Sequence, residues 1–161
     1  MQHLFAPWRF AYVTRADGET GCIFCAAASG DNPALTVAED ERTVALLNRY
    51  PYTSGHTMIA PREHVSDLTR LDSATLVEMM HLAQRVMQAL QQLYAPHGFN
   101  LGLNLGEAAG AGIADHLHLH VVPRWRGDTS FITVNADVRV LPEDLAVTRT
   151  KLKQALGADR A

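Results

Sequence analysis

Three histidines alternate with apolar residues in the segment HLHLHVV, which spans residues 116–122. In an extended strand every second side chain lies on the same face. His116, His118 and His120 would therefore form one row of imidazoles, with an apolar face behind them. The alternation predicts a strand that is buried on one side and polar on the other, so the chain has to build a sheet around it.

A second alternating segment lies shortly before the first. Residues 99–105 read FNLGLNL, and a loop rich in small residues, 107–113, separates them from the histidines. A parallel pair of strands needs a crossover of about a dozen residues or more, usually a helix. The short separation therefore predicts that these two strands are antiparallel neighbours.

The remaining elements are predicted from periodicity and turn residues. Residues 43–47 and 55–60 are typical of strands. Residues 73–94 repeat apolar side chains at helical spacing, with Ser73 as the expected N-cap. A C-terminal helix is expected from about 141 to 156, because a proline and two acids suit its first turn. We therefore expect an α+β fold with a small antiparallel sheet of about five strands, one long helix and a C-terminal helix.

Length and composition fit one globular domain. The chain has 161 residues, of which 47% are hydrophobic, and its net charge is -3. We expect an aromatic-rich N-terminal arm at residues 1–20 and a single domain at residues 21–161. The charge does not favour nucleic acid, and neither a secretory signal nor a membrane span is recognised. The expected location is the cytoplasm.

The row of imidazoles allows more than one chemistry. Its first and last members lie about 13 Å apart along a strand, so all three cannot bind one zinc ion, whose ligand nitrogens lie within about 2.1 Å of the metal. One or two of them can still be ligands. A neutral imidazole can also attack phosphorus or carry protons, and the small residues at 110–113 let backbone N–H groups approach a phosphate. The alternative is a row of solvated surface histidines.

The two cysteines of the chain, Cys22 and Cys25, stand in the segment CIFC. Such a pair can be redox-active, can bind a metal or can pack in the core. A closed zinc site built on two thiolates needs two further ligands. A redox role is disfavoured, because no thioredoxin-like βαβ pattern surrounds the pair.

The segment HLHLHVV matches the signature of the histidine triad family in full, and the chain resembles that family over roughly residues 20 to 125. The match includes NRYPYTSGHTMIAPREH at 48–64 and FNLGLNLGEAAGAG at 99–112. The resemblance implies the family's small-sheet fold and a two-fold homodimer whose two sheets join. It also implies a nucleotide as the substrate.

The resemblance further implies how the family would use these histidines. His118 would attack the α-phosphorus of a nucleotide and form a covalent nucleotidyl-histidine. His120 would hydrogen-bond the α-phosphate or the bridging oxygen and assist the leaving group. His56 would lie beside the triad and support it.

Four further positions correspond to the nucleotide-binding residues of the family. Asn48 stands where the family places a ribose-contacting Asn or Asp, and Asn104 would face ribose or phosphate. Gly112 and Ile113 would offer their backbone to the phosphate. The sequence departs from the family here, because Ala111, Gly112 and Ile113 replace a frequent Gly-Gln-Ser or Gly-Gln-Thr. The side-chain amide and hydroxyl expected near the leaving group are therefore missing.

The resemblance also implies a role for the cysteine pair. Family members that carry such a pair complete a structural zinc site with two histidines, which correspond here to His64 and His116. The ligand set would be Cys22, Cys25, His64 and His116. His116 would then serve the metal, and the other two triad histidines would serve the chemistry.

Within the family, the residues around the triad and the N-terminal LFAPWRFAYV resemble the bacterial diadenosine tetraphosphate phosphorylases or hydrolases. The two activities differ in whether phosphate or water resolves the intermediate. Arg124 and Arg126 either contact the polyphosphate or are exposed solubilising residues. The alternatives are a purine nucleoside phosphoramidate hydrolase and a zinc-stabilised nucleotide-binding module without turnover.

Overall fold

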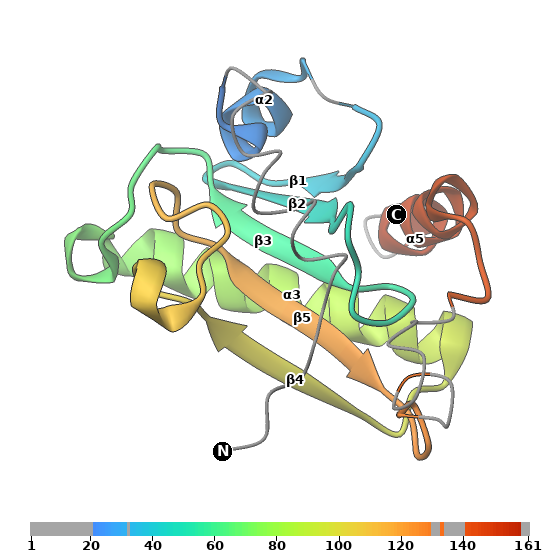
Figure 1. Cartoon of the computed structure of the whole chain (residues 1–161). Coiled ribbons are helices and arrows are strands. Elements are labelled where there is room, and N and C mark those ends of the chain that lie inside the picture. The colour runs from blue at the N-terminus through green and yellow to red at the C-terminus, as the bar shows by residue number, and fades with distance from the viewer. Residues whose placement is uncertain (1–20, 32, 130–132, 134–140, 159–161) are drawn as a thin grey trace, which may run out of the picture.

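The computed structural model describes residues 21–31, 33–129, 133 and 141–158. Its centre is a five-stranded antiparallel sheet with the strand order β1-β2-β3-β5-β4 (Figure 1). The strands are β1 (Thr36–Glu39), β2 (Thr43–Leu47), β3 (Thr57–Pro61), β4 (Gly98–Leu103) and β5 (Leu119–Arg124). The predicted α+β class and the antiparallel pairing of the two late strands are confirmed. The predicted arm at 1–20 lies outside the described residues.

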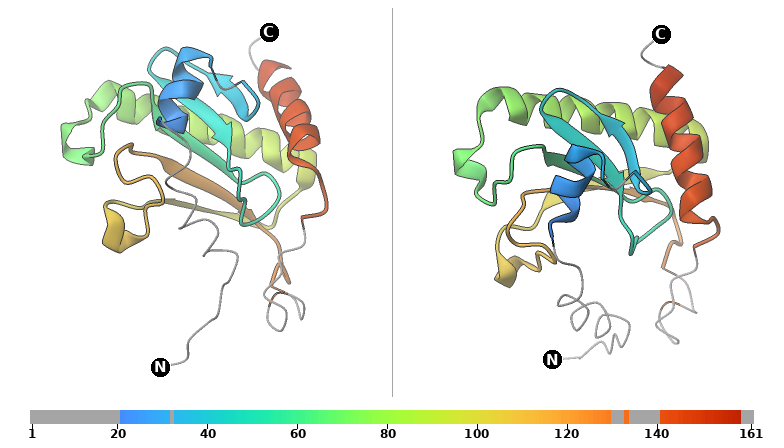
Figure 2. Two further views of the ribbon diagram at one scale, coloured as in Figure 1. Left: turned by 45° about the horizontal axis from the view of Figure 1, so that its top comes forward. Right: turned by 90° about the horizontal axis from the view of Figure 1, so that it is seen from above.

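Helices lie on both faces of the sheet. The long α3 (Ser73–Tyr94) and α5 (Leu145–Ala158) lie on one side, and the short α2 (Ile23–Ser29) lies on the other (Figure 2). Two 3₁₀ turns, η1 (Leu68–Arg70) and η2 (Glu107–Ala109), belong to the connections. In the described part of the chain, no helix is both long and apolar enough to cross a bilayer.

Two apolar clusters hold these layers together. On the α3 side, one face of the sheet packs against α3 and α5 through Ala45, Leu47, Ile59, Leu119, Val121, Leu82, Val86, Leu90, Leu152 and Leu156. On the α2 side, a smaller cluster joins α2 to β2 and β3 through Phe24, Ala27, Val44, Leu46, Met58 and Ala60. Because β2 and β3 are covered on both faces, every residue of both strands is buried, and apolar residues follow one another after an initial threonine instead of alternating.

The long helix spans the predicted residues, but its cap and one face differ from expectation. Asp72, not Ser73, is the N-cap, and its carboxylate accepts a hydrogen bond from the backbone N–H of Thr75 at 3.0 Å. On the apolar face Met79 is buried, whereas Met80 is 50% exposed. Met80 follows Met79 directly, which turns its side chain about 100° away around the helix axis.

Several strand and helix boundaries also differ from expectation. Strand β3 begins two residues after Gly55, which occupies a turn with φ 80° that suits glycine. Strand β5 begins at Leu119, so His116 and His118 precede it, with His116 in a bend. Helix α5 begins at Leu145, after Asp144, whose carboxylate accepts a hydrogen bond from the backbone N–H two residues later at 2.8 Å. Residues 141–144, which were predicted to open this helix, therefore precede α5.

Candidate active site and metal centre

The sheet topology brings the histidines of two distant segments together. Strand β3 pairs with β5, and Met58 lies opposite His120 in their register. His56, just before β3, therefore reaches His120, with 2.9 Å between the Nε2 atom of His56 and the Nδ1 atom of His120. The rings of His118 and His120 meet edge to face, with 4.9 Å between their centroids. Three of the predicted catalytic residues thus form one contiguous group.

The surroundings of His118 determine which of its nitrogens is free. Its Nδ1 lies 2.8 Å from the carbonyl oxygen of His116. A carbonyl only accepts, so Nδ1 carries the proton and donates it, and Nε2 keeps its lone pair. Burial lowers the pKa of His118 below its usual value, although the hydrogen bond to the His116 carbonyl partly opposes this effect. His118 is therefore a neutral imidazole at pH 7 with a free Nε2, as a nucleophile requires.

A chain of hydrogen bonds fixes the proton of His120 in the same way. The backbone N–H of Tyr52 donates to Nδ1 of His56 at 3.1 Å, so His56 is protonated at Nε2. The Nε2–H of His56 in turn donates to Nδ1 of His120. Neutral His120 then carries its proton on Nε2 and is a hydrogen-bond donor there. Burial is the main cause that lowers the pKa of His120 to about 4, with a smaller contribution from His118.

Asn48 lies against this chain rather than in open solvent. Its Nδ2 atom is 3.4 Å from Nδ1 of His56, and its Oδ1 accepts from the backbone N–H of Tyr50 at 2.9 Å. The side chain is partly exposed. The structure therefore places Asn48 next to the predicted catalytic group.

A groove of about 900 Å³ opens beside His120 over β4 and β5. Asn104 lines it together with His120, whereas Gly112 and Ile113 do not. The side chain of Ile113 packs instead against the cluster under α2. Of these three predicted binding residues, only Asn104 lines the groove, and its Nδ2 donates to the carbonyl oxygen of Gly110 at 3.4 Å.

The two arginines after the triad have different environments. Arg124 lines the groove, but its guanidinium already bonds Asp128 at 2.5 Å and Asn100 at 2.7 Å. Asp128 raises the pKa of Arg124 through a hydrogen bond and its charge. Arg126 is exposed and is not among the groove residues. Of the two alternatives, the role of an exposed solubilising residue therefore fits Arg126 better than it fits Arg124.

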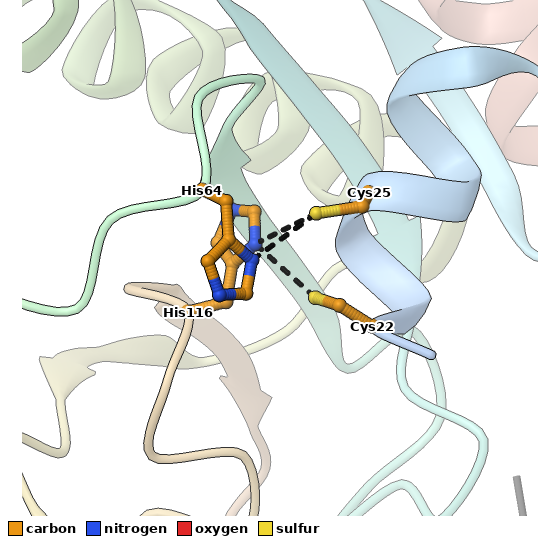
Figure 3. Close-up of side chains that lie close together, drawn as sticks. All are labelled: Cys22, Cys25, His64 and His116. Atoms are coloured by element: carbon orange, nitrogen blue, oxygen red, sulfur yellow. Dashed lines mark hydrogen bonds between the residues drawn. The ribbon is translucent and has the colours of Figure 1, made fainter. Parts of the chain in front are cut away.

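The four predicted metal ligands converge at one point (Figure 3). Their ligand atoms all lie within 4.8 Å of one another. The Sγ atom of Cys22 is 3.2 Å from Nδ1 of His116, and Sγ of Cys25 is 3.2 Å from Nδ1 of His64 and 3.6 Å from Nδ1 of His116. A tetrahedral ion with ligands at about 2.0–2.3 Å has ligand–ligand distances of about 3.3–3.8 Å. The three distances lie close to this range, so the four residues could hold a metal ion.

The hydrogen bonds of His116 also suit a metal ligand. Its Nε2 lies 2.9 Å from the carbonyl oxygen of Pro61, so Nε2 donates its proton there and Nδ1 turns its lone pair toward the cysteines. Burial and the neighbouring Cys22 raise the pKa of the Cys25 thiol. A bound cation would favour the thiolates instead.

Two residues that sequence reasoning missed take part in this arrangement. Tyr52 contributes a backbone N–H, which no side-chain pattern could reveal. Phe24, which stands between the two cysteines, is completely buried and contacts the rings of both His116 and His118. Its position between two predicted ligands was the signal available in the sequence.

Comparison with known proteins identifies the family. The family model of the HIT domain matches residues 29–127. The chain belongs to the HIT family. The AP-4-A phosphorylase of Mycobacterium tuberculosis, a relative, is 38% identical over 94% of this chain and 83% of its own length. Protein hit of Bacillus subtilis is 31% identical over 85% of this chain and 95% of its own length.

Solved HIT structures share the fold. A Zn-bound histidine triad family protein from Mycobacterium smegmatis has a TM-score of 0.72 at 37% identity, covering 87% of this chain and 96% of its own. A hypothetical histidine triad nucleotide-binding protein from Sulfolobus tokodaii has a TM-score of 0.70 at 27% identity, covering 85% and 93%. Together, the HIT domain and the phosphorylase relative support a nucleotide hydrolase or transferase activity.

Proposed function

We propose that this HIT protein cleaves dinucleoside polyphosphates of the diadenosine tetraphosphate type through a covalent nucleotidyl-His118. The observation that carries the proposal is the hydrogen bond from Nδ1 of His118 to the His116 carbonyl, which leaves Nε2 free and neutral. The M. tuberculosis relative, named AP-4-A phosphorylase, supports the substrate class.

The proposed reaction has two displacements at phosphorus. In the first, the Nε2 lone pair of His118 attacks the α-phosphorus, and the bond to the bridging oxygen breaks with its electron pair on the leaving nucleotide. The Nε2–H of His120 donates a hydrogen bond to that oxygen. In the second, an oxygen of inorganic phosphate or of water attacks the same phosphorus and releases His118. Phosphate would yield a nucleoside diphosphate, and water a nucleoside monophosphate.

We propose phosphate as the main acceptor, since the M. tuberculosis relative is named a phosphorylase. The proposed acceptor site is open where Gly112 and Ile113 replace the amide and hydroxyl side chains frequent in the family. Ile113 packs toward α2, so its side chain does not reach across the triad.

The direct test is to incubate the protein with diadenosine tetraphosphate, with and without inorganic phosphate, and to separate the products. We expect ADP and ATP in the presence of phosphate and much slower formation of AMP and ATP without it. AMP and ATP at the same rate under both conditions would make the protein a hydrolase. Binding without turnover of this substrate would support a non-catalytic module, and turnover of adenosine phosphoramidates alone would support the phosphoramidate hydrolase.

We also propose that the metal site formed by Cys22, Cys25, His64 and His116 holds structural zinc. The clustering of the four ligand atoms within 4.8 Å of one another and the Zn-bound relative from M. smegmatis support this assignment. A site filled by four protein ligands has no open position for substrate, so zinc would supply rigidity rather than chemistry. It would tie α2 to the segments that precede β5 and follow β3.

We further propose a homodimer that joins two sheets at β4. Strand β4 is an edge of the sheet, and Leu101 within it is 39% exposed; Leu105, two residues beyond its end, is 47% exposed. Natural proteins avoid a long, exposed, apolar edge strand unless it is covered or paired. A second copy would cover it.

A further inference from the structure

Phe24 lies between the metal-binding segment and the proposed nucleophile. It occupies the first turn of α2, flanked in sequence by Cys22 and Cys25, and its side chain is 0% exposed. Its ring stacks on His118, with 4.8 Å between centroids and 27° between planes. It also contacts His116 in a tilted geometry, with centroids 5.1 Å apart. One buried ring thus touches both a predicted metal ligand and the predicted nucleophile.

The hydrogen bond from Nδ1 of His118 to the His116 carbonyl fixes the tautomer, but one hydrogen bond leaves the ring free to swing about that bond. The flat face of Phe24 blocks this motion on one side. His120 lies against the ring of His118 edge-on. The stack on Phe24 is therefore the contact that sets the plane of the imidazole, and the plane sets the direction of Nε2.

We propose that Phe24 is a positioning residue that holds the ring plane of His118, so that α2 and its two cysteines aim the nucleophile. Phe24 is completely buried and does not line the groove, so it would act through His118, whose ring it contacts. The backbone of His116 contributes the second link, because this metal ligand also supplies the carbonyl that bonds His118. The expected effect of Phe24 on the rate of nucleotide transfer rests on the proposed function. Its expected effect on the ring plane of His118 does not.

The test compares Phe24→Leu with Leu46→Val. Both residues belong to the cluster under α2 and both are completely buried, so each variant removes packing from the same cluster. Only Phe24→Leu removes the ring stacked on His118. Metal content and thermal unfolding are measured for both, and the fraction of competent sites is titrated so that partial unfolding is not read as a lower rate.

Two readouts decide the proposal. The first is the single-turnover rate of nucleotide transfer to His118, which should fall about tenfold in Phe24→Leu, because small misplacements of a reacting group cost rates of this order. Nucleotide affinity and metal content should be unchanged, and Leu46→Val should react like the wild type. The second is the proton NMR signal of Hε1 of His118, assigned from its loss in His118→Asn. This signal should move downfield when the stacked ring is removed.

An unchanged Hε1 signal in Phe24→Leu would overturn the proposal, and so would equal rate losses in the two variants. A shifted signal with an unchanged rate would overturn it as well. If the wild type forms no nucleotidyl-histidine at all, the proposed function fails. The NMR comparison would still decide whether the ring of Phe24 is stacked on His118 in the folded protein.

Discussion

At His118, a backbone carbonyl decides which ring nitrogen keeps its lone pair. The hydrogen bond to the His116 carbonyl and the burial of the ring both favour a neutral imidazole with a free Nε2. The segment HLHLHVV predicted the row of histidines, whereas the grouping of His116 with the cysteine pair came from the resemblance to the histidine triad family. The structure brings His116 and the two cysteines together. The tautomers could not be predicted, because they depend on backbone groups that sequence does not distinguish, such as the N–H of Tyr52.

Replacement of His56 tests the hydrogen-bond chain at the same scale. In His56→Phe, Nδ1 of His120 loses its donor, and His120 can no longer be held as an Nε2–H donor. We expect kcat to fall about 10- to 100-fold with little change in nucleotide affinity. The control is His81→Gln, which alters an exposed histidine on α3. Equal kcat values in His56→Phe and the wild type would show that the chain has no role in turnover.

The low pKa of His120 predicts an acid-sensitive fold. Above about pH 6.5 neither state binds a proton at this ring, whereas between pH 6.5 and about 4 the unfolded chain binds one and the folded protein does not. The free energy of unfolding should therefore decrease as pH falls through this window. Urea titrations at pH 7 and pH 5 measure the decrease, which should be smaller in His120→Gln. The same decrease in both proteins would assign the effect to other groups.

At the scale of elements, periodic segments were predictable and short ones were not. The β2 and α3 bounds agree with the predicted residues, because their apolar patterns are long or bounded by clear turns. Helix α2 was missed, since it has seven residues and no side-chain N-cap bond, and it is held by packing. Strand β1 was missed because four residues give too little pattern.

The proposed metal holds α2, and its removal should be felt there first. We expect about one equivalent of zinc in the purified protein, and a lower melting temperature after chelation or in Cys22→Ser. Amide hydrogen exchange should increase in α2, whose short length depends on external support, while α3 stays protected. Unchanged exchange in α2 after zinc removal would contradict a structural role for the metal.

At the scale of the whole molecule, the exposed edge of β4 predicts self-association. Sedimentation should give about 35 kDa, twice the 17.6 kDa of one chain. Leu101→Lys should shift the protein toward monomer by placing charge on the edge strand. Leu141→Lys is the matched control, because Leu141 is similarly exposed but lies outside the sheet. A dimer that survives Leu101→Lys unchanged would place the interface elsewhere.

The proposed mechanism depends on one covalent bond, between Nε2 of His118 and the α-phosphorus. Rapid acid-free quenching of a reaction with diadenosine tetraphosphate, followed by intact-mass and peptide mass spectrometry, detects it directly. We predict one adenylyl group per chain, carried by His118, and none in His118→Asn, which should still bind nucleotide. Turnover without any adenylyl adduct, or an adduct that persists in His118→Asn, would contradict the account.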